Sequence, residues 1–145
     1  MSENGNGGYL SLDAIKRAPD INFRDVPVPE WGGTVRIRSL TASDRAKFDA
    51  KLLTVRQQMR IGQSVDDQEL SIEHHAHQAR VLLVTLSLCD ENGSRIFTDE
   101  QTEIVGAKGS AAIARIYEAA SELNGMSAKA KAALQGESEG ADATA

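Results

Sequence analysis

Three histidines form the tightest cluster of possible metal ligands in the 145-residue chain. If His74, His75 and His77 lie on a helix, His74 and His77 share a face, and Glu73 lies one turn before His77 on the same side. Zinc accepts such ligands, but a structural or catalytic site needs three or four of them. Cys89 lies roughly three turns away, and the HExxH pattern is absent. We therefore favour ordinary histidines on a solvated helix over a small metal-dependent enzyme that uses His74 and His77.

The sequence also lacks the surroundings of a reactive nucleophile. Cys89 is the only cysteine, and its leucine-rich neighbourhood is typical of a buried, inert thiol rather than an activated one. No GxSxG motif is present, and the glycines of residues 106–110 do not have the GxxxxGK(S/T) spacing of a phosphate loop. The sequence predicts no catalytic residue, no cofactor site and no metal site.

The charge of the chain argues against two classes of partner. The formal net charge is -5 at pH 7, and an acidic chain has no general attraction to phosphate backbones or anionic membranes. Arg36 and Arg38 lie close together, but we favour a solvated or salt-bridged strand face over a nucleic-acid patch. The single cysteine and the lack of a signal segment or membrane span indicate a soluble, intracellular protein.

The elements that would position these residues begin with a hairpin over residues 24–40. Val35 and Ile37 alternate with polar residues, as in a strand with one buried face. Gly32 and Gly33 fit a two-residue hairpin turn, because glycine accepts the positive φ angles that such turns require.

Two prolines and a tryptophan indicate how this hairpin is placed. Pro27 and Pro29 would direct their missing N–H groups to the same side of a strand, so that side must be a free edge. A two-stranded hairpin is marginal alone. It should therefore lie on the helices, with Trp31 as its anchor.

Helical patterns fill most of the rest of the chain. Aromatic residues are only 4% of it, so an aliphatic core is expected, and capping boxes begin at Thr41 and Thr98. The stretch Val81–Leu88 would also allow a strand, but it continues a long helical pattern. The expected helices cover about residues 43–61, 71–88, 99–105 and 110–124. The expected fold is mainly α (α+β), a small helical domain with an N-terminal two-stranded β-hairpin packed on about three to four helices.

The chain divides into three expected parts. Residues 1–20 form a flexible arm with a short helix that Ser11 caps and Pro19 stops. Residues 21–125 form a single folded domain. Residues 126–145 comprise an Ala/Lys-rich helix and an acidic, disordered tail.

Several local strings, in their shared order, resemble the siphophage tail assembly chaperones, minor tail proteins encoded beside the tape measure protein. The strings are residues 28–33 (VPEWGG), 35–41 (VRIRSLT), 89–93 (CDENG), 97–100 (FTDE) and 119–125 (AASELNG). The resemblance covers about residues 10–127, which is most of the expected folded part.

The resemblance implies a non-enzymatic role in building the phage tail. Such proteins bind the tape measure protein, keep it soluble and help to recruit the tail tube protein. They act in the host cell cytoplasm and are absent from the mature virion. Self-association into a homo-oligomer is possible for such a protein. The alternatives are a tail completion or connector protein that stays in the virion, a metal-dependent enzyme and a nucleic-acid-binding regulator.

Contact with a partner should involve apolar residues that a small core cannot bury. A tape measure helix exposes apolar stripes before the tube covers it, and amphipathic helices can cover such stripes. The competing interpretation is that these side chains pack internally. The candidate partner-binding residues lie in marginal elements: Leu12, Ile15, Trp31, Leu123, Met126 and Leu134.

Overall fold

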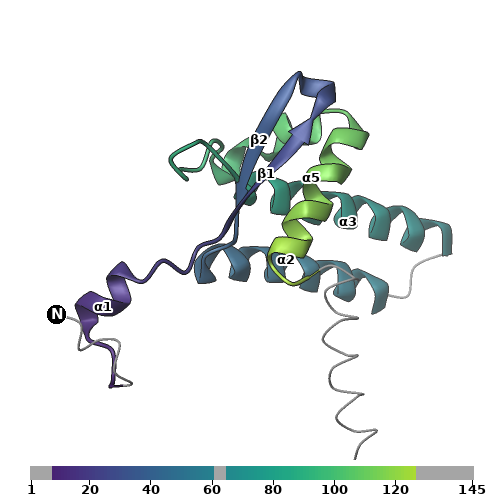
Figure 1. Ribbon diagram of the computed structural model, residues 1–145. Coiled ribbons are helices and arrows are strands. Elements are labelled where there is room, and N and C mark those ends of the chain that lie inside the picture. The colour runs from purple at the N-terminus through teal and green to yellow at the C-terminus, as the bar shows by residue number, and fades with distance from the viewer. Residues whose placement is uncertain (1–7, 61–64, 127–145) are drawn as a thin grey trace, which may run out of the picture.

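The computed structural model describes residues 8–60 and 65–126 (Figure 1). Five α-helices alternate with three strands and two short 3-10 helices within these ranges. In chain order, the elements are α1 (Leu12–Arg17), β1 (Phe23–Val28), η2 (Pro29–Trp31), β2 (Gly33–Arg38), α2 (Ala42–Arg60), α3 (Val65–Ser87), β3 (Leu88–Cys89), η3 (Asp99–Gln101), α4 (Thr102–Gly106) and α5 (Ser110–Leu123). The fold is the expected small, mainly helical α+β domain with a hairpin near its N-terminus.

The sheet contains one strand more than the expected hairpin. Its antiparallel order is β1-β2-β3, with Val26 opposite Val35 and Ile37 opposite Leu88. The helix α3 continues through Ser87, so a strand over most of Val81–Leu88 does not form. The chain becomes extended only at Leu88, which pairs with Ile37 of β2, 51 positions earlier in the sequence.

Two hydroxyl residues that favour strands are accommodated inside α3. The side chains of Thr85 and Ser87 are buried and donate hydrogen bonds to the carbonyl oxygens of Val81 and Leu83, at 2.8 and 2.7 Å. A buried hydroxyl without a partner would destabilise the helix, whereas these backbone carbonyls satisfy both groups. Their presence is therefore compatible with a buried helix.

The hairpin turn differs from the two-residue turn that the glycine pair predicts. Gly33 is the first residue of β2 and lies opposite Val28, so the loop contains four residues, Pro29–Gly32. Pro29 begins the 3-10 helix η2, where its fixed φ is favourable, and Gly32 ends it with a φ of 75°. The two-residue turn was wrong because only Gly32 takes a left-handed conformation; among the described glycines, Gly33 is not one of those with positive φ.

Pro27 lies on the free edge of the sheet, as the sequence predicts. The N–H of Ser39 donates to the carbonyl oxygen of Asn22 at 2.8 Å, so these two residues form a hydrogen-bonded pair. Such pairs alternate along an antiparallel ladder, so Arg24, Val26 and Val28 are the next residues of β1 that bond to β2. The nitrogen of Pro27 therefore points away from β2, where it removes no ladder bond. Pro29 lies outside the strand, so the expectation that both prolines mark one strand edge was wrong for Pro29.

The helix α3 begins six residues before the predicted start at residue 71. The polar stretch before Ser71 does not end a helix but forms its first turns. The other predicted helices are found within a few residues, except that residues 99–101 form a 3-10 turn.

The core lies between the inner face of the sheet and the helices α3 and α5. α5 lies alongside the hairpin, and α2 and α3 run antiparallel beside it (Figure 1). The apolar second half of α3 is the buried centre, as the sequence predicts. The buried core cluster includes Val26, Val28, Ile37, Phe48, Leu83, Val84, Leu86, Leu88, Val105, Ile113 and Ile116.

The ends of α1 and α5 follow their predicted caps. The N–H of Ala14 donates to the Ser11 hydroxyl at 3.1 Å, and α1 ends at Arg17, just before Pro19. After α5, the N–H of Met126 donates to the carbonyl oxygen of Ser121 at 2.7 Å, and Gly125 has a φ of 69°. This arrangement is a Schellman cap. The predicted Ala/Lys-rich helix and acidic tail lie outside the described residues.

Gly93 combines a left-handed backbone with a close neighbour. Its φ is 85°, and a Cβ at this position would lie 2.9 Å from Cε1 of Phe23. We expect Gly93→Ala to lower the free energy of unfolding by about 2 kcal/mol, because both strain and overlap are introduced. Gly32→Ala is the matched control, since its φ is 75° but its surroundings are open. Urea denaturation should show a larger loss for Gly93→Ala; equal losses would mean that Phe23 moves aside freely.

Candidate functional site

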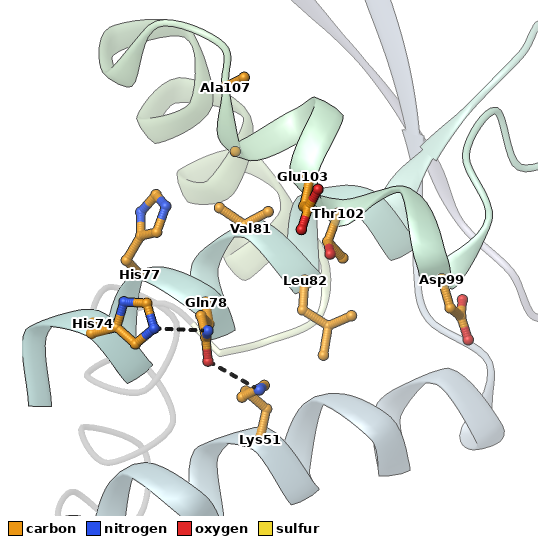
Figure 2. A pocket seen from close by; sticks show the side chains of 11 residues that line it. Lys51, His74, His77, Gln78, Val81, Leu82, Asp99, Thr102, Glu103 and Ala107 are labelled. Carbon is orange, nitrogen blue, oxygen red and sulfur yellow. Dashed lines mark hydrogen bonds between the residues drawn. The ribbon is translucent and has the colours of Figure 1, made fainter. Parts of the chain in front are cut away.

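A groove between three elements contains the two histidines that the sequence places on one helix face. His74 and His77 lie on α3 before Val81 and Leu82, and the opposite wall comes from η3 and α4 (Figure 2). The groove encloses about 690 Å³, which is within the usual range of binding clefts. The predicted shared face of His74 and His77 is therefore present; both side chains are exposed, as expected for a solvated helix face, and they line the rim of the groove.

Hydrogen bonds tie one histidine to its neighbours rather than to a ligand site. His74 Nε2 lies 3.0 Å from the side-chain nitrogen of Gln78, and the Gln78 oxygen accepts a hydrogen bond from Lys51 Nζ at 3.2 Å (Figure 2). The ring of His75 packs edge-on against that of His74. Within residues 8–60 and 65–126, no three potential ligands converge on a common point, so the geometry gives the metal hypothesis no support there.

Asp99, an acidic residue in the wall of the groove, already forms ion pairs within the fold. Asp99 accepts hydrogen bonds from Lys47 Nζ at 2.5 Å and from Arg95 at 2.6 Å. Lys47 also lies 3.7 Å from Asp44, which is buried and pairs with Arg38 at 3.5 Å. This network joins η3 to α2 and to the sheet. The hydrogen bonds from Lys47 and then Arg95 hold the pKa of the Asp99 carboxyl below its ordinary value of 3.8.

Replacing Asp99 with asparagine should give a small, pH-dependent loss of stability. The pKa of Asp99 is lower in the folded protein than its ordinary value. The ion pairs therefore stabilise the fold fully at pH values above the ordinary pKa, and this stabilisation is lost as the pH falls through the pKa of the folded state. The side chain is 33% exposed, so we expect a loss of only about 0.5–1 kcal/mol in the free energy of unfolding at pH 7. Urea denaturation from pH 7 to pH 3 should show the two proteins converging. Glu100→Gln, its exposed neighbour, is the control, and a difference that persists at low pH would contradict the ion-pair origin.

Cys89 is buried in β3, in agreement with its leucine-rich neighbourhood. Burial raises the pKa of its thiol, so the reactive thiolate is disfavoured. The nearby Arg36 and Arg38 act in the opposite direction, but the effect of burial is larger. The structure therefore places this thiol in an environment that suits packing rather than nucleophilic attack.

The two strand arginines are engaged by the loop that follows β3. Arg36 donates to the carbonyl oxygen of Glu91 at 2.6 Å, and Arg38 donates to that of Gly93 at 3.3 Å. Arg36 also lies 4.7 Å from the centre of the Phe23 ring, a cation–π distance. Both arginines are thus engaged within the fold, and Arg38 also pairs with Asp44; that this face is not a nucleic-acid patch stays a prediction.

An exposed apolar arm is the most conspicuous surface of the molecule. The helix α1 has no buried residue and projects from the body in Figure 1. Leu12 is 68% exposed and Ile15 is 59% exposed, and the sequence also places Tyr9 and Leu10, both exposed, beside them. We call these four residues the apolar arm. Sequence reasoning missed Tyr9 and Leu10, although their position just before the Ser11 cap could have indicated them.

The other predicted partner-binding residues do not join this arm. Trp31, Leu123 and Met126 are half-buried and pack against the core, while Leu134 lies outside the described residues. Trp31 thus occupies the anchoring position that the hairpin was expected to need. Contact with a partner through these residues remains a prediction.

No helix in the described ranges combines the length and the apolar character needed to cross a lipid bilayer.

Comparison with known proteins relates the chain to a protein family and to a solved structure. A family model described as phage tail assembly chaperone matches residues 11–137. A solved structure, "Structure of bacteriophage HK97 tail assembly chaperone", has 21% sequence identity and a TM-score of 0.52; the match covers 77% of this chain and 91% of that chain. At this sequence identity, the structural similarity shows that the two proteins share a fold. No curated protein matches the chain.

Proposed function

Because this chain belongs to the phage tail assembly chaperone family, we propose that it binds the tape measure protein of its phage and helps to recruit the tail tube protein. The family consists of assembly proteins rather than enzymes. In this proposal the chain acts by stoichiometric association in the host cytoplasm. It keeps the tape measure protein soluble and is absent from the mature virion.

The apolar arm is the observation that supports this proposal. Four large apolar residues lie exposed within seven positions of Tyr9–Ile15, whereas such residues in a soluble protein are usually scattered singly. A six-residue helix is too short to be stable alone, so α1 gains most when a partner covers it. A long helical partner with exposed apolar stripes offers a suitable surface.

Co-expression with the tape measure protein tests the proposal. If the chain is its chaperone, the soluble fraction of the tape measure protein should rise with the dose of the chain, and the two proteins should elute together in size-exclusion chromatography. A tape measure protein that stays in the pellet at every dose would contradict the proposal. A parallel pull-down with the tail tube protein tests recruitment separately.

The apolar arm would also suit a connector that remains in the particle. Mass spectrometry of purified virions distinguishes the two roles, because a chaperone should be missing and a connector should be present in a fixed ratio to the tube protein. Self-association through the same arm is tested by sedimentation of the isolated chain over a range of concentrations.

A further inference from the structure

The groove on α3 runs along the axis of the helix. His74, Gln78 and Leu82 are spaced by four positions and therefore form one row on its surface. The row spans about 12 Å at 1.5 Å per residue. Helices pack by placing the ridges of one between such rows of the other. The length and direction of the groove thus match about two turns of another helix.

The groove has an apolar floor, and part of its far wall is made of small residues. Val81 and Leu82 form an apolar floor, and the wall at the end of α4 is made by Gly106 and Ala107 (Figure 2). A Cβ at Gly106 would lie 3.7 Å from Val81, in ordinary contact. The small residues at the end of α4 leave room beside the apolar floor for apolar side chains of a partner.

Glu103 is a charged residue of the groove that has no ion-pair partner among the described residues. Asp99 is held by Lys47 and Arg95, and Lys51 is held by Gln78. Within the described part of the chain, the Glu103 carboxylate has no side-chain hydrogen bond or ion pair, although it borders the apolar floor. A partner that placed a cation here would gain an ion pair without breaking another, so this wall selects for a basic residue.

We infer that this groove binds an amphipathic helix of the tape measure protein whose apolar stripe is flanked by a lysine or arginine that pairs with Glu103. The inference rests on the proposed function, since that partner supplies the helix. The apolar stripe covers Val81 and Leu82, and the basic residue lies toward α4. This surface is separate from the apolar arm, so the chain has two distinct contacts for one long partner.

Overlapping 20-residue peptides of the tape measure protein, titrated into the full chain and followed by NMR, test this inference. At least one peptide with a basic residue beside its apolar stripe should shift the amide signals of Val81, Leu82 and Glu103. Glu103→Lys and Ala107→Glu should each weaken its binding about tenfold, because one reverses the charge and the other obstructs the hollow. Changing the basic residue of that peptide to glutamate should restore binding to Glu103→Lys. Glu100→Lys, which does not line the groove, is the matched control, and thermal melting checks the fold of every variant.

The outcomes separate this inference from the proposed function. If the tape measure protein is solubilised but Glu103→Lys and Ala107→Glu bind its peptides as well as the natural chain does, the groove assignment is wrong and the proposed function stands. If neither the peptides nor the intact protein bind, both are wrong. A peptide of residues 9–17 of this chain is included as a competitor. If only this peptide occupies the groove, the occupant is the arm of a second copy, and the tape measure assignment fails.

Discussion

Replacing both Leu12 and Ile15 with serine is expected to abolish the solubilisation of the tape measure protein without changing the stability of the chain. Both side chains are exposed and α1 contains no buried residue, so the free energy of unfolding should change by about 0.5 kcal/mol or less. Binding, in contrast, would lose the apolar area that drives it. Co-expression and sedimentation of the lysate measure the first effect, and urea denaturation measures the second.

Leu53→Ser provides the matched control for this prediction. Leu53 is 53% exposed on α2, so its replacement removes a similar exposed apolar side chain from another part of the surface. It should leave solubilisation intact. Full solubilisation by the Leu12→Ser, Ile15→Ser double variant would show that the apolar arm does not carry the contact and would direct attention to the groove.

The largest effect on stability is expected for Leu83→Ala. Leu83 is completely buried in the second half of α3, between the sheet and the neighbouring helices, and its truncation leaves a cavity. Removing a leucine side chain from such a site lowers the free energy of unfolding by about 2–5 kcal/mol. Leu53→Ala is the same change at an exposed position and should cost about 0.5 kcal/mol or less. Similar losses for the two variants would contradict the central position of α3 in the core.

The features that the sequence predicts well are those whose causes are local. The Ser11 cap of α1 and the Gly125 end of α5 depend on residues within one helical turn. The buried stripe of α5, with Ile113 and Ile116 one turn apart, follows from helical periodicity alone. The edge position of Pro27 follows from its missing N–H group. Each of these predictions uses chemistry that is complete within a short window.

The features that the sequence does not predict depend on distant partners. Leu88 and Cys89 continue the apolar pattern of α3, and only their pairing with Ile37 and Arg36 makes them a strand. The early start of α3 was hidden because a polar stretch suits both a loop and an exposed helix end. The four-residue turn was missed because two adjacent glycines also fit a tighter one.

The candidate sites also divide into features with local causes and features that depend on the tertiary fold. Leu12 and Ile15 could be named as candidates for exposure because they lie in a short helix before Pro19, a local feature, although internal packing was the competing interpretation. The groove could not be expected, because its walls come from three segments around Lys51, Leu82 and Glu103 that only the tertiary fold brings together. Sequence spacing identified the two histidines of its rim but not the hollow beside them.

The short connection between α1 and β1 determines how the two contacts would work together. Only Ala18–Asn22 separate the helix from the sheet, and five extended residues span about 17 Å at most. Once the arm has engaged a partner, the groove is therefore confined to a small volume around the same polymer, at an effective concentration in the millimolar range. Two individually weak contacts would then give high avidity, and the chain could release one contact and rebind further along without leaving the polymer.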